Sequence, residues 1–356
     1  MNNIKTDTLR YIVNENSPIF LVTTASILIN IIAIHWVPEN INLMEKFIES
    51  CKNDYQHFIF ATLLVYCILF GINKLYPKID NIKKTTEIKN VISSVISSIL
   101  IFICIFNFTT FKHAIPLINP FSWDPLLFKV DKLLLLNNHP AQLIQTLLPL
   151  HNLKYISDMC YASWAIVSVA ILLWQNISPQ RKLRTQFLLS WLLSWIILGS
   201  ICALLFSSVG PCFYDAFYAS TPKDILLANK QLQQNPTEYF YLTDAAKSML
   251  VQVAQSESFI TGFGISAFPS LHVSISALNA IIIGKYNKYI GYIGWIYVFI
   301  TSLCCVYLGF HYLVDCIAGV IGTCSIWVLT GKALNKQNKK TTFNIAGANY
   351  TTRTRI

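Results

Sequence analysis

The chain has 356 residues, of which 54% are apolar and only 12% are charged, and its mean hydropathy is +0.49. Soluble domains carry about 25% charged residues, so this chain has about half of the usual solvating charge. Its apolar residues gather in blocks long enough to cross a bilayer as a helix, which takes about 20 residues. This composition excludes an ordinary cytosolic enzyme, a disordered protein and a small secreted disulfide scaffold.

Apolar blocks of this length occur eight times, and they predict an all-α, polytopic bundle of about eight transmembrane helices. The blocks cover residues 18–36, 55–73, 90–111, 159–177, 187–206, 268–284, 290–310 and 312–330. The first block has no small-residue cleavage site at its end, so we interpret it as a retained span rather than a signal peptide.

Two regions between the blocks are too polar to span a membrane. Residues 112–155 predict short amphipathic helices at the interface, and residues 207–267 form a long polar loop whose aromatic residues indicate a folded cap. The chain is therefore expected to consist of N-terminal spans over residues 1–111, a membrane core over residues 112–330 and a basic tail over residues 331–356.

The distribution of basic residues predicts the orientation. Eight spans place both termini on one side, and the loops and tails of that side carry 18 of the 27 Lys and Arg residues, against 9 on the other. The positive-inside rule then places both termini in the cytoplasm and residues 207–267 on the periplasmic or lumenal face. This topology accounts for most of the net charge of +10, so no nucleic-acid partner is expected.

The ten cysteines give no metal-binding pattern with the histidines, and no metal or other cofactor is expected. Eight of them fall inside the apolar blocks, where cysteine behaves as a small hydrophobic residue. Cys51 and Cys212 both face the non-cytoplasmic side, and a disulfide between them is one hypothesis.

Three polar clusters reach the non-cytoplasmic ends of the spans. Residues 268–272 (FPSLH) open the sixth block, residues 309–315 (GFHYLVD) open the eighth, and residues 210–215 (GPCFYD) close the fifth. Ionisable residues inside spans are functional hypotheses by default. These clusters predict one site at that face, with Gly210 and Tyr214 among its substrate contacts.

The spacing within these clusters favours phosphoryl transfer. His311 and Asp315 are four residues apart and would share a helix face, so the carboxylate can fix the imidazole tautomer and leave the other nitrogen as a nucleophile. Pro269 suits the first position of a helix, and the N–H groups from Ser270 onward would then form an anion site. His272 can protonate a leaving oxygen. We predict a phosphohistidine intermediate.

The motifs resemble those of the type 2 phosphatidic acid phosphatase superfamily, which has P-S-G-H and S-R-x5-H-x3-D elements on a six-helix core. The resemblance implies that His311 is the nucleophile, Asp315 its orienting partner, His272 the general acid and Ser270 a phosphate ligand. It implies no metal requirement. In this chain Leu271 replaces the glycine of P-S-G-H. Cysteines 304 and 305 stand where the Ser-Arg pair would fall, and no Arg-Pro pair occurs.

A narrower branch, the inositol phosphorylceramide synthases and their bacterial relatives, looks like this chain in F-P-S-L-H, in the H-Y-x-x-D run and in the segment over residues 123–131. This resemblance implies an integral-membrane lipid phosphotransferase. It would move a phosphoinositol-like headgroup from a phospholipid donor to a ceramide-like lipid alcohol. Lysines must then replace the missing arginines, and Lys112 and Lys132 are the first candidates.

Two alternatives stay open. Water in place of the lipid alcohol would make the same site a lipid phosphate phosphatase. A transport or structural protein of the same fold is the other alternative, but a transporter would place its polar residues near the bilayer midplane. The ionisable residues of this chain lie close to span ends, which favours chemistry on a headgroup.

Overall fold

The protein is described by a computed structural model over residues 2–37, 45, 67, 84–85, 87–150, 152–233, 241–255 and 264–353. All of its regular elements in these residues are helices. They are α1 (Asn2–His35), α4 (Ile88–Ile118), α5 (Asp124–Leu134), α6 (Pro140–Leu147), α7 (Leu153–Asn176), α8 (Arg181–Leu193), η2 (Ser194–Cys202), α9 (Ala203–Leu205), η3 (Pro211–Phe213), α10 (Tyr214–Phe217), α11 (Lys223–Gln233), α12 (Leu242–Gln255), α13 (Leu271–Tyr286), α14 (Lys288–Tyr307) and α15 (Leu313–Arg353).

Six of the described helical stretches are long and apolar enough to cross a membrane: α1, α4, α7, the continuous run from α8 to α9, α14 and α15. The shorter apolar helix α13 has 16 residues. Each coincides with a predicted block, which confirms a polytopic helical membrane protein. The predicted span over residues 55–73 lies outside the described residues.

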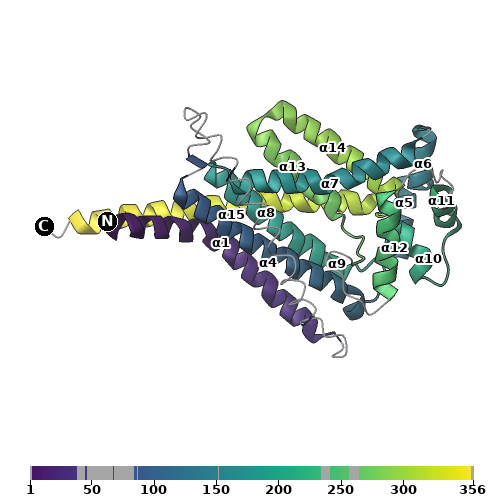
Figure 1. The fold of residues 1–356 in the computed structure, drawn as a ribbon, viewed down its shortest axis with the longest axis horizontal. Coiled ribbons are helices and arrows are strands. Elements are labelled where there is room, and N and C mark those ends of the chain that lie inside the picture. The colour runs from purple at the N-terminus through teal and green to yellow at the C-terminus, as the bar shows by residue number, and fades with distance from the viewer. Residues whose placement is uncertain are drawn as a thin grey trace.

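Figure 1 shows the two ends of the molecule. The N-terminal part of α1 and the C-terminal part of α15 lie together at one end, and helices α5, α6 and α10 to α12 gather at the opposite end. Helix α1 runs alongside α4. Two buried hydrogen bonds join the helices, from the side-chain amide of Asn16 to Ser93 and from that of Asn30 to Asn107, each 3.0 Å long. Such interhelical hydrogen bonds are a recognised source of cohesion between membrane helices.

The loop over residues 207–267 holds helices α10, α11 and α12 in its described part, so it forms a helical cap. Helix α12 is fixed to α7, because the Asp158 carboxylate accepts the N–H groups of Leu242 and Thr243 at 3.0 and 2.7 Å. A second attachment is made by Lys247, whose Nζ donates to the Leu308 carbonyl at the end of α14 at 2.8 Å.

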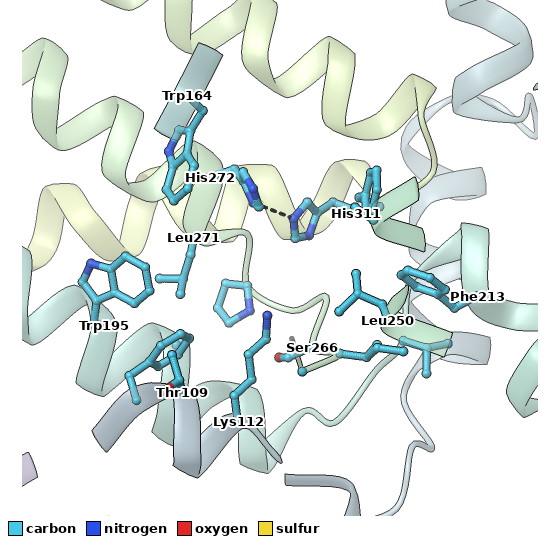
Figure 2. Close-up of a pocket in the computed structure, with 18 of the residues that line it drawn as sticks. Thr109, Lys112, Trp164, Trp195, Phe213, Leu250, Ser266, Leu271, His272 and His311 are labelled. Carbon is cyan, nitrogen blue, oxygen red and sulfur yellow. Dashed lines mark hydrogen bonds between the residues drawn. The ribbon is translucent and has the colours of Figure 1, made fainter. Parts of the chain in front are cut away.

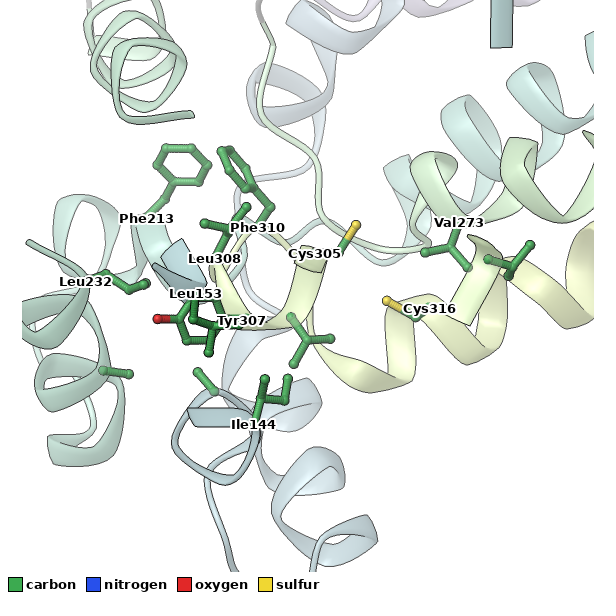
Figure 3. Packing of buried hydrophobic residues seen from close by; sticks show 14 of the residues in the cluster. Ile144, Leu153, Phe213, Leu232, Val273, Cys305, Tyr307, Leu308, Phe310 and Cys316 are labelled. Carbon is green, nitrogen blue, oxygen red and sulfur yellow. The ribbon is translucent and has the colours of Figure 1, made fainter. Parts of the chain in front are cut away.

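Two glycines join the cap to the turn between α14 and α15. Gly309 (φ +78°) and Gly210 (φ +91°) both adopt a left-handed conformation that favours glycine. A Cβ on Gly210 would lie 2.5 Å from the carbonyl oxygen of Phe310, and the N–H of Cys212 donates to Gly309 O at 2.7 Å. This junction is continued by a hydrophobic cluster that packs cap residues such as Phe213 against the end of α14 (Figure 3).

Candidate active site

The two histidines predicted from the sequence face each other at the edge of a cavity (Figure 2). His311 Nδ1 lies 2.8 Å from the carbonyl oxygen of Ala267. A carbonyl can only accept, so Nδ1 carries a proton, and in the neutral imidazole Nε2 then keeps its lone pair. That Nε2 lies 3.5 Å from Nδ1 of His272, so with a neutral His311 the donor in this contact is His272. The pair therefore presents an unprotonated nitrogen and an N–H group to the same space.

The sequence predicted that His311 and Asp315 share a helix, but they do not. It lies in the turn before α15, which begins at Leu313. Asp315 Oδ2 accepts the N–H of Tyr312 at 2.8 Å and lies 3.7 Å from His311 Nδ1. The short hydrogen bond of the His311 imidazole is thus made to the carbonyl of Ala267. The buried carboxylate of Asp315 lies farther from the same nitrogen and also caps the start of α15.

Aromatic rings hold His272 in place. Tyr161 stacks on its imidazole with ring centroids 4.5 Å apart, and Trp164 lies at 4.4 Å. Tyr161 stacks in turn on Phe310 at 4.8 Å, next to His311 in the chain. Tyr161 and Trp164 both belong to α7, so this helix fixes the orientation of the His272 imidazole. The sequence analysis did not identify them, because aromatic residues in a span resemble ordinary core residues.

The cavity in front of the histidines has a volume of about 400 Å³. Lys112 of α4 is the one Lys or Arg side chain among the described residues that line it, and its amine points into the space (Figure 2). The described arginines with side-chain contacts, Arg181 and Arg184, begin α8 at the end of the bundle that holds the chain termini. Among Lys and Arg side chains, the described wall of the cavity consequently offers one positive charge to a phosphate.

The predicted anion-binding helix start differs in detail from the expectation. Helix α13 begins at Leu271 with Ser270 as its N-cap, so Pro269 precedes the helix instead of opening it. Ser270 is fully buried, its N–H donates to Asp315 O at 3.1 Å and its hydroxyl accepts from Val273 N at 3.4 Å. Pro269 lines the cavity, whereas Ser270 lies behind its wall.

Three other predicted contacts lie away from the cavity wall. Gly210 donates its N–H to the Asp124 carboxylate at 2.8 Å. Tyr214 is buried against the ring of Tyr218, and Lys132 forms an ion pair of 2.6 Å with Asp224 of α11. Of the nine predicted site residues, those that line the cavity are Pro269, His272, His311 and Lys112.

Helix α5 contributes two buried carboxylates that the sequence analysis did not assign to the site. Asp124 accepts four hydrogen bonds of 2.8 to 3.0 Å, from the N–H groups of residues 209 and 210 and the hydroxyls of Tyr218 and Tyr312. Asp131 accepts the N–H groups of residues 313 and 314 at 2.7 and 2.9 Å, and burial raises its pKa to about 7. The two carboxylates therefore hold residues 312–314, which directly follow His311, and Asp124 also ties them to residues 209 and 210. Their spacing of seven residues, which places them on one helix face, is the signal that could have revealed them.

Cys305, which stands at the position of the superfamily arginine, is fully buried beneath the turn. Its carbonyl accepts the N–H groups of Phe310 and His311 at 3.1 and 3.4 Å, so the residue supports the turn from inside. The Cys51–Cys212 disulfide stays a prediction, since Cys51 lies outside the described residues. Within the described parts of the chain, no group of three or more His, Cys, Asp or Glu side chains is arranged to hold a metal ion.

The sequence model of the PAP2 superfamily matches residues 126–329, which is more than half of the chain and extends from α5 to α15. No curated protein and no solved structure gives a significant match. The matched region includes both histidines, Asp315 and Asp131 of α5, while Asp124 and Lys112 lie outside it. The chain belongs to the PAP2 superfamily, whose members act as lipid phosphatases and phosphotransferases.

Proposed function

We propose that this protein is a lipid phosphotransferase that moves a phospho-headgroup from a phospholipid donor to a lipid alcohol through a phosphohistidine on His311. The observation that carries the proposal is the pair formed by the unprotonated Nε2 of His311 and the N–H of His272, 3.5 Å apart at one cavity. This contact is expected to rearrange when substrate enters.

The proposed reaction has two steps. His311 Nε2 attacks the donor phosphorus while the bond to the diacylglycerol oxygen breaks, and that oxygen takes a proton from the imidazolium form of His272, which becomes neutral. The acceptor hydroxyl then attacks the phosphorus as the bond to His311 Nε2 breaks. Its proton goes to the neutral His272, which regenerates the imidazolium form of His272 and the neutral His311. Ala267 O accepts a hydrogen bond from the Nδ1–H group of His311 throughout. This hydrogen bond stabilises the positive charge that develops on the imidazole of His311 when it attacks phosphorus.

The charge in the cavity favours a phosphodiester substrate. A phosphodiester carries one negative charge, which Lys112 alone can balance, whereas a phosphomonoester carries about −1.5 to −2 at pH 7. Burying an unpaired charge is costly. The mostly apolar wall, with residues such as Trp164, Trp195 and Leu250, also favours a lipid alcohol over water as acceptor. Phosphatidylinositol and ceramide are the donor and acceptor that we propose to try first.

We propose that the reaction takes place on the periplasmic or lumenal face. The basic residues favour cytoplasmic termini, and the termini and the cap lie at opposite ends of the bundle (Figure 1). Substrate and product would thus enter and leave sideways from the outer leaflet beneath the helical cap.

The test uses purified protein in detergent micelles with a headgroup-labelled phospholipid and a lipid alcohol. Labelled product is expected with the wild type and with His35→Ala, a matched control at the exposed end of α1. It should be lost with His311→Ala and with His272→Ala. Label released to water at the same rate with or without acceptor would make the protein a hydrolase. Product formation that survives both site substitutions would contradict the proposed mechanism.

A further inference from the structure

We propose that the arm of the cavity between α4 and η2 binds a hydrocarbon chain of the lipid substrate, and that Leu271 sets the width of this arm. The inference rests on the proposed function for the identity of the lipid, although chain binding itself can be measured without turnover. Four observations support it: the composition of the arm, its depth, a tight packing contact of Leu271 and the irregular helix beside it.

The cavity extends from the histidines in two directions (Figure 2). One leads past Leu250 toward Phe213 of the cap, and the other leads past Leu271 toward Trp195. The walls of the second arm are Ile105 and Phe108 of α4, Trp195 and Gly199 of η2, and Leu271 of α13. The remaining polar side chain there, Thr109, already donates its hydroxyl to Phe106 O at 2.9 Å. Such a surface suits a hydrocarbon chain.

The arm also lies at the correct depth. Ile105 precedes Lys112 by about two helical turns, or about 10 Å along the axis. The direction from Lys112 to Ile105 is toward the end of the bundle that holds the termini, because α4 runs beside α1 from Asn90, which Tyr11 contacts, to Asn107, which Asn30 contacts. A phosphate at Lys112 with its chain in this arm would thus point its hydrocarbon into the membrane and its headgroup toward the cap.

The contact between Leu271 and Gly199 defines the width of the arm. A Cβ on Gly199 would lie 2.7 Å from Leu271 Cδ1 and 2.8 Å from Phe108 Cε2, so the leucine fits because residue 199 has no side chain. The superfamily motif has glycine at position 271, and its substitution by leucine adds a side chain to the arm. Gly199 lies in η2, a stretch of π-helix inside a membrane span, and such irregular turns are often found at functional sites.

The first experiment changes the width of the arm from both sides. Gly199→Ala should push the flexible tip of Leu271 into the arm, and Leu271→Ala should enlarge it. The matched control is Gly322→Ala, whose Cβ would meet Leu198 Cδ2 at the same 2.7 Å but outside the residues that line the cavity. The assay compares kcat/KM for phospholipid donors that differ only in acyl-chain length, and for a phosphodiester with the same headgroup and no acyl chain.

We expect Gly199→Ala to lose about fourfold in kcat/KM for each methylene that the arm no longer buries, with no loss on the chain-free phosphodiester. Leu271→Ala should shift the preference toward longer or bulkier chains, and Gly322→Ala should keep the wild-type preference. An equal loss on every donor, or the same shift in the Gly322→Ala control, would overturn the inference.

A second experiment separates this inference from the proposed reaction. A phospholipid with a diazirine at the end of its acyl chain is incorporated into vesicles with wild-type protein and with His311→Ala, and cross-linked peptides are sequenced. Labelling of residues 105–109 or 195–199 in both proteins supports the chain-binding arm even if no transfer is detected. Labelling confined to the other apolar groove, between α6, α14 and α15 near Phe299, would overturn the inference while leaving the proposed function intact.

Discussion

Replacing Asp124 by asparagine tests whether helix α5 holds the turn that carries His311. The carboxylate is fully buried and accepts four hydrogen bonds, two on each oxygen. Asparagine replaces one oxygen by an NH2 group that cannot accept, so two of the four donors lose their acceptor. A buried donor without a partner costs about 1–3 kcal/mol, which gives about 2–6 kcal/mol in total for Asp124→Asn.

The assay measures both stability and turnover of Asp124→Asn in the same detergent. A lower thermal midpoint is expected, together with a loss in kcat that exceeds the change in KM for the donor, because the substitution displaces His311 while Lys112 and the wall formed by α4 and η2 stay in place. Asp215→Asn, an exposed acid on the neighbouring helix α10, is the control and should behave as wild type. Wild-type stability and kcat in Asp124→Asn would refute the idea that α5 positions the turn.

Three further predictions follow from buried charges. Burial raises the pKa of Asp131 to about 7, above the usual value of about 3.9, so the folded protein binds this proton more tightly than the unfolded chain does. The stability that the protonated carboxyl group contributes is lost as pH rises from about 4 to about 7. The difference in thermal midpoint, wild type minus Asp131→Asn, should therefore fall across this pH window. Parallel curves of midpoint against pH for the two proteins would contradict the raised pKa of Asp131. Arg184→Met leaves the carboxylate of Glu15, 3.6 Å away, without its buried partner and should lower the free energy of unfolding by about 3–5 kcal/mol, which a denaturant titration measures and an unchanged midpoint would contradict. Lys112→Met should raise KM for the donor about 10- to 100-fold, because it removes a hydrogen bond to a charged group worth about 1.5–3 kcal/mol. The control Lys129→Met, at an exposed position, should leave KM unchanged. Equal KM values for wild type and Lys112→Met in steady-state assays would exclude Lys112 as the phosphate ligand.

Sequence reasoning located the helices well because apolar blocks of membrane length have few other interpretations. It also brought His272 and His311 to one face, since the positions of polar residues at span ends follow directly from the topology. The prediction that His311 and Asp315 share a helix face was wrong. A spacing of four residues indicates one helix face, but Tyr312 acts as the cap of α15 and His311 falls in the preceding turn.

Contacts between distant segments could not be predicted in this way. The carbonyl that fixes the tautomer of His311 belongs to Ala267, a residue whose side chain carries no chemical signal. Gly210 and Ser270 had the residue types of a phosphate site, yet the first is used in a tight turn and the second as a helix cap. Among the candidate lysines, Lys112 lines the cavity and Lys132 pairs with an acid of the cap, a distinction that depends on tertiary packing.

Direct detection of the phosphohistidine tests the central claim. A labelled aryl ester of the phospho-headgroup needs no acid for its leaving group, so His272→Ala should still form the intermediate but lack the base that activates the acceptor. We predict an alkali-stable, acid-labile label that accumulates in His272→Ala on a peptide containing residues 309–315, and that is absent when His311 is also replaced by alanine. Label on a different residue, or turnover in the His311→Ala variant, would contradict the account.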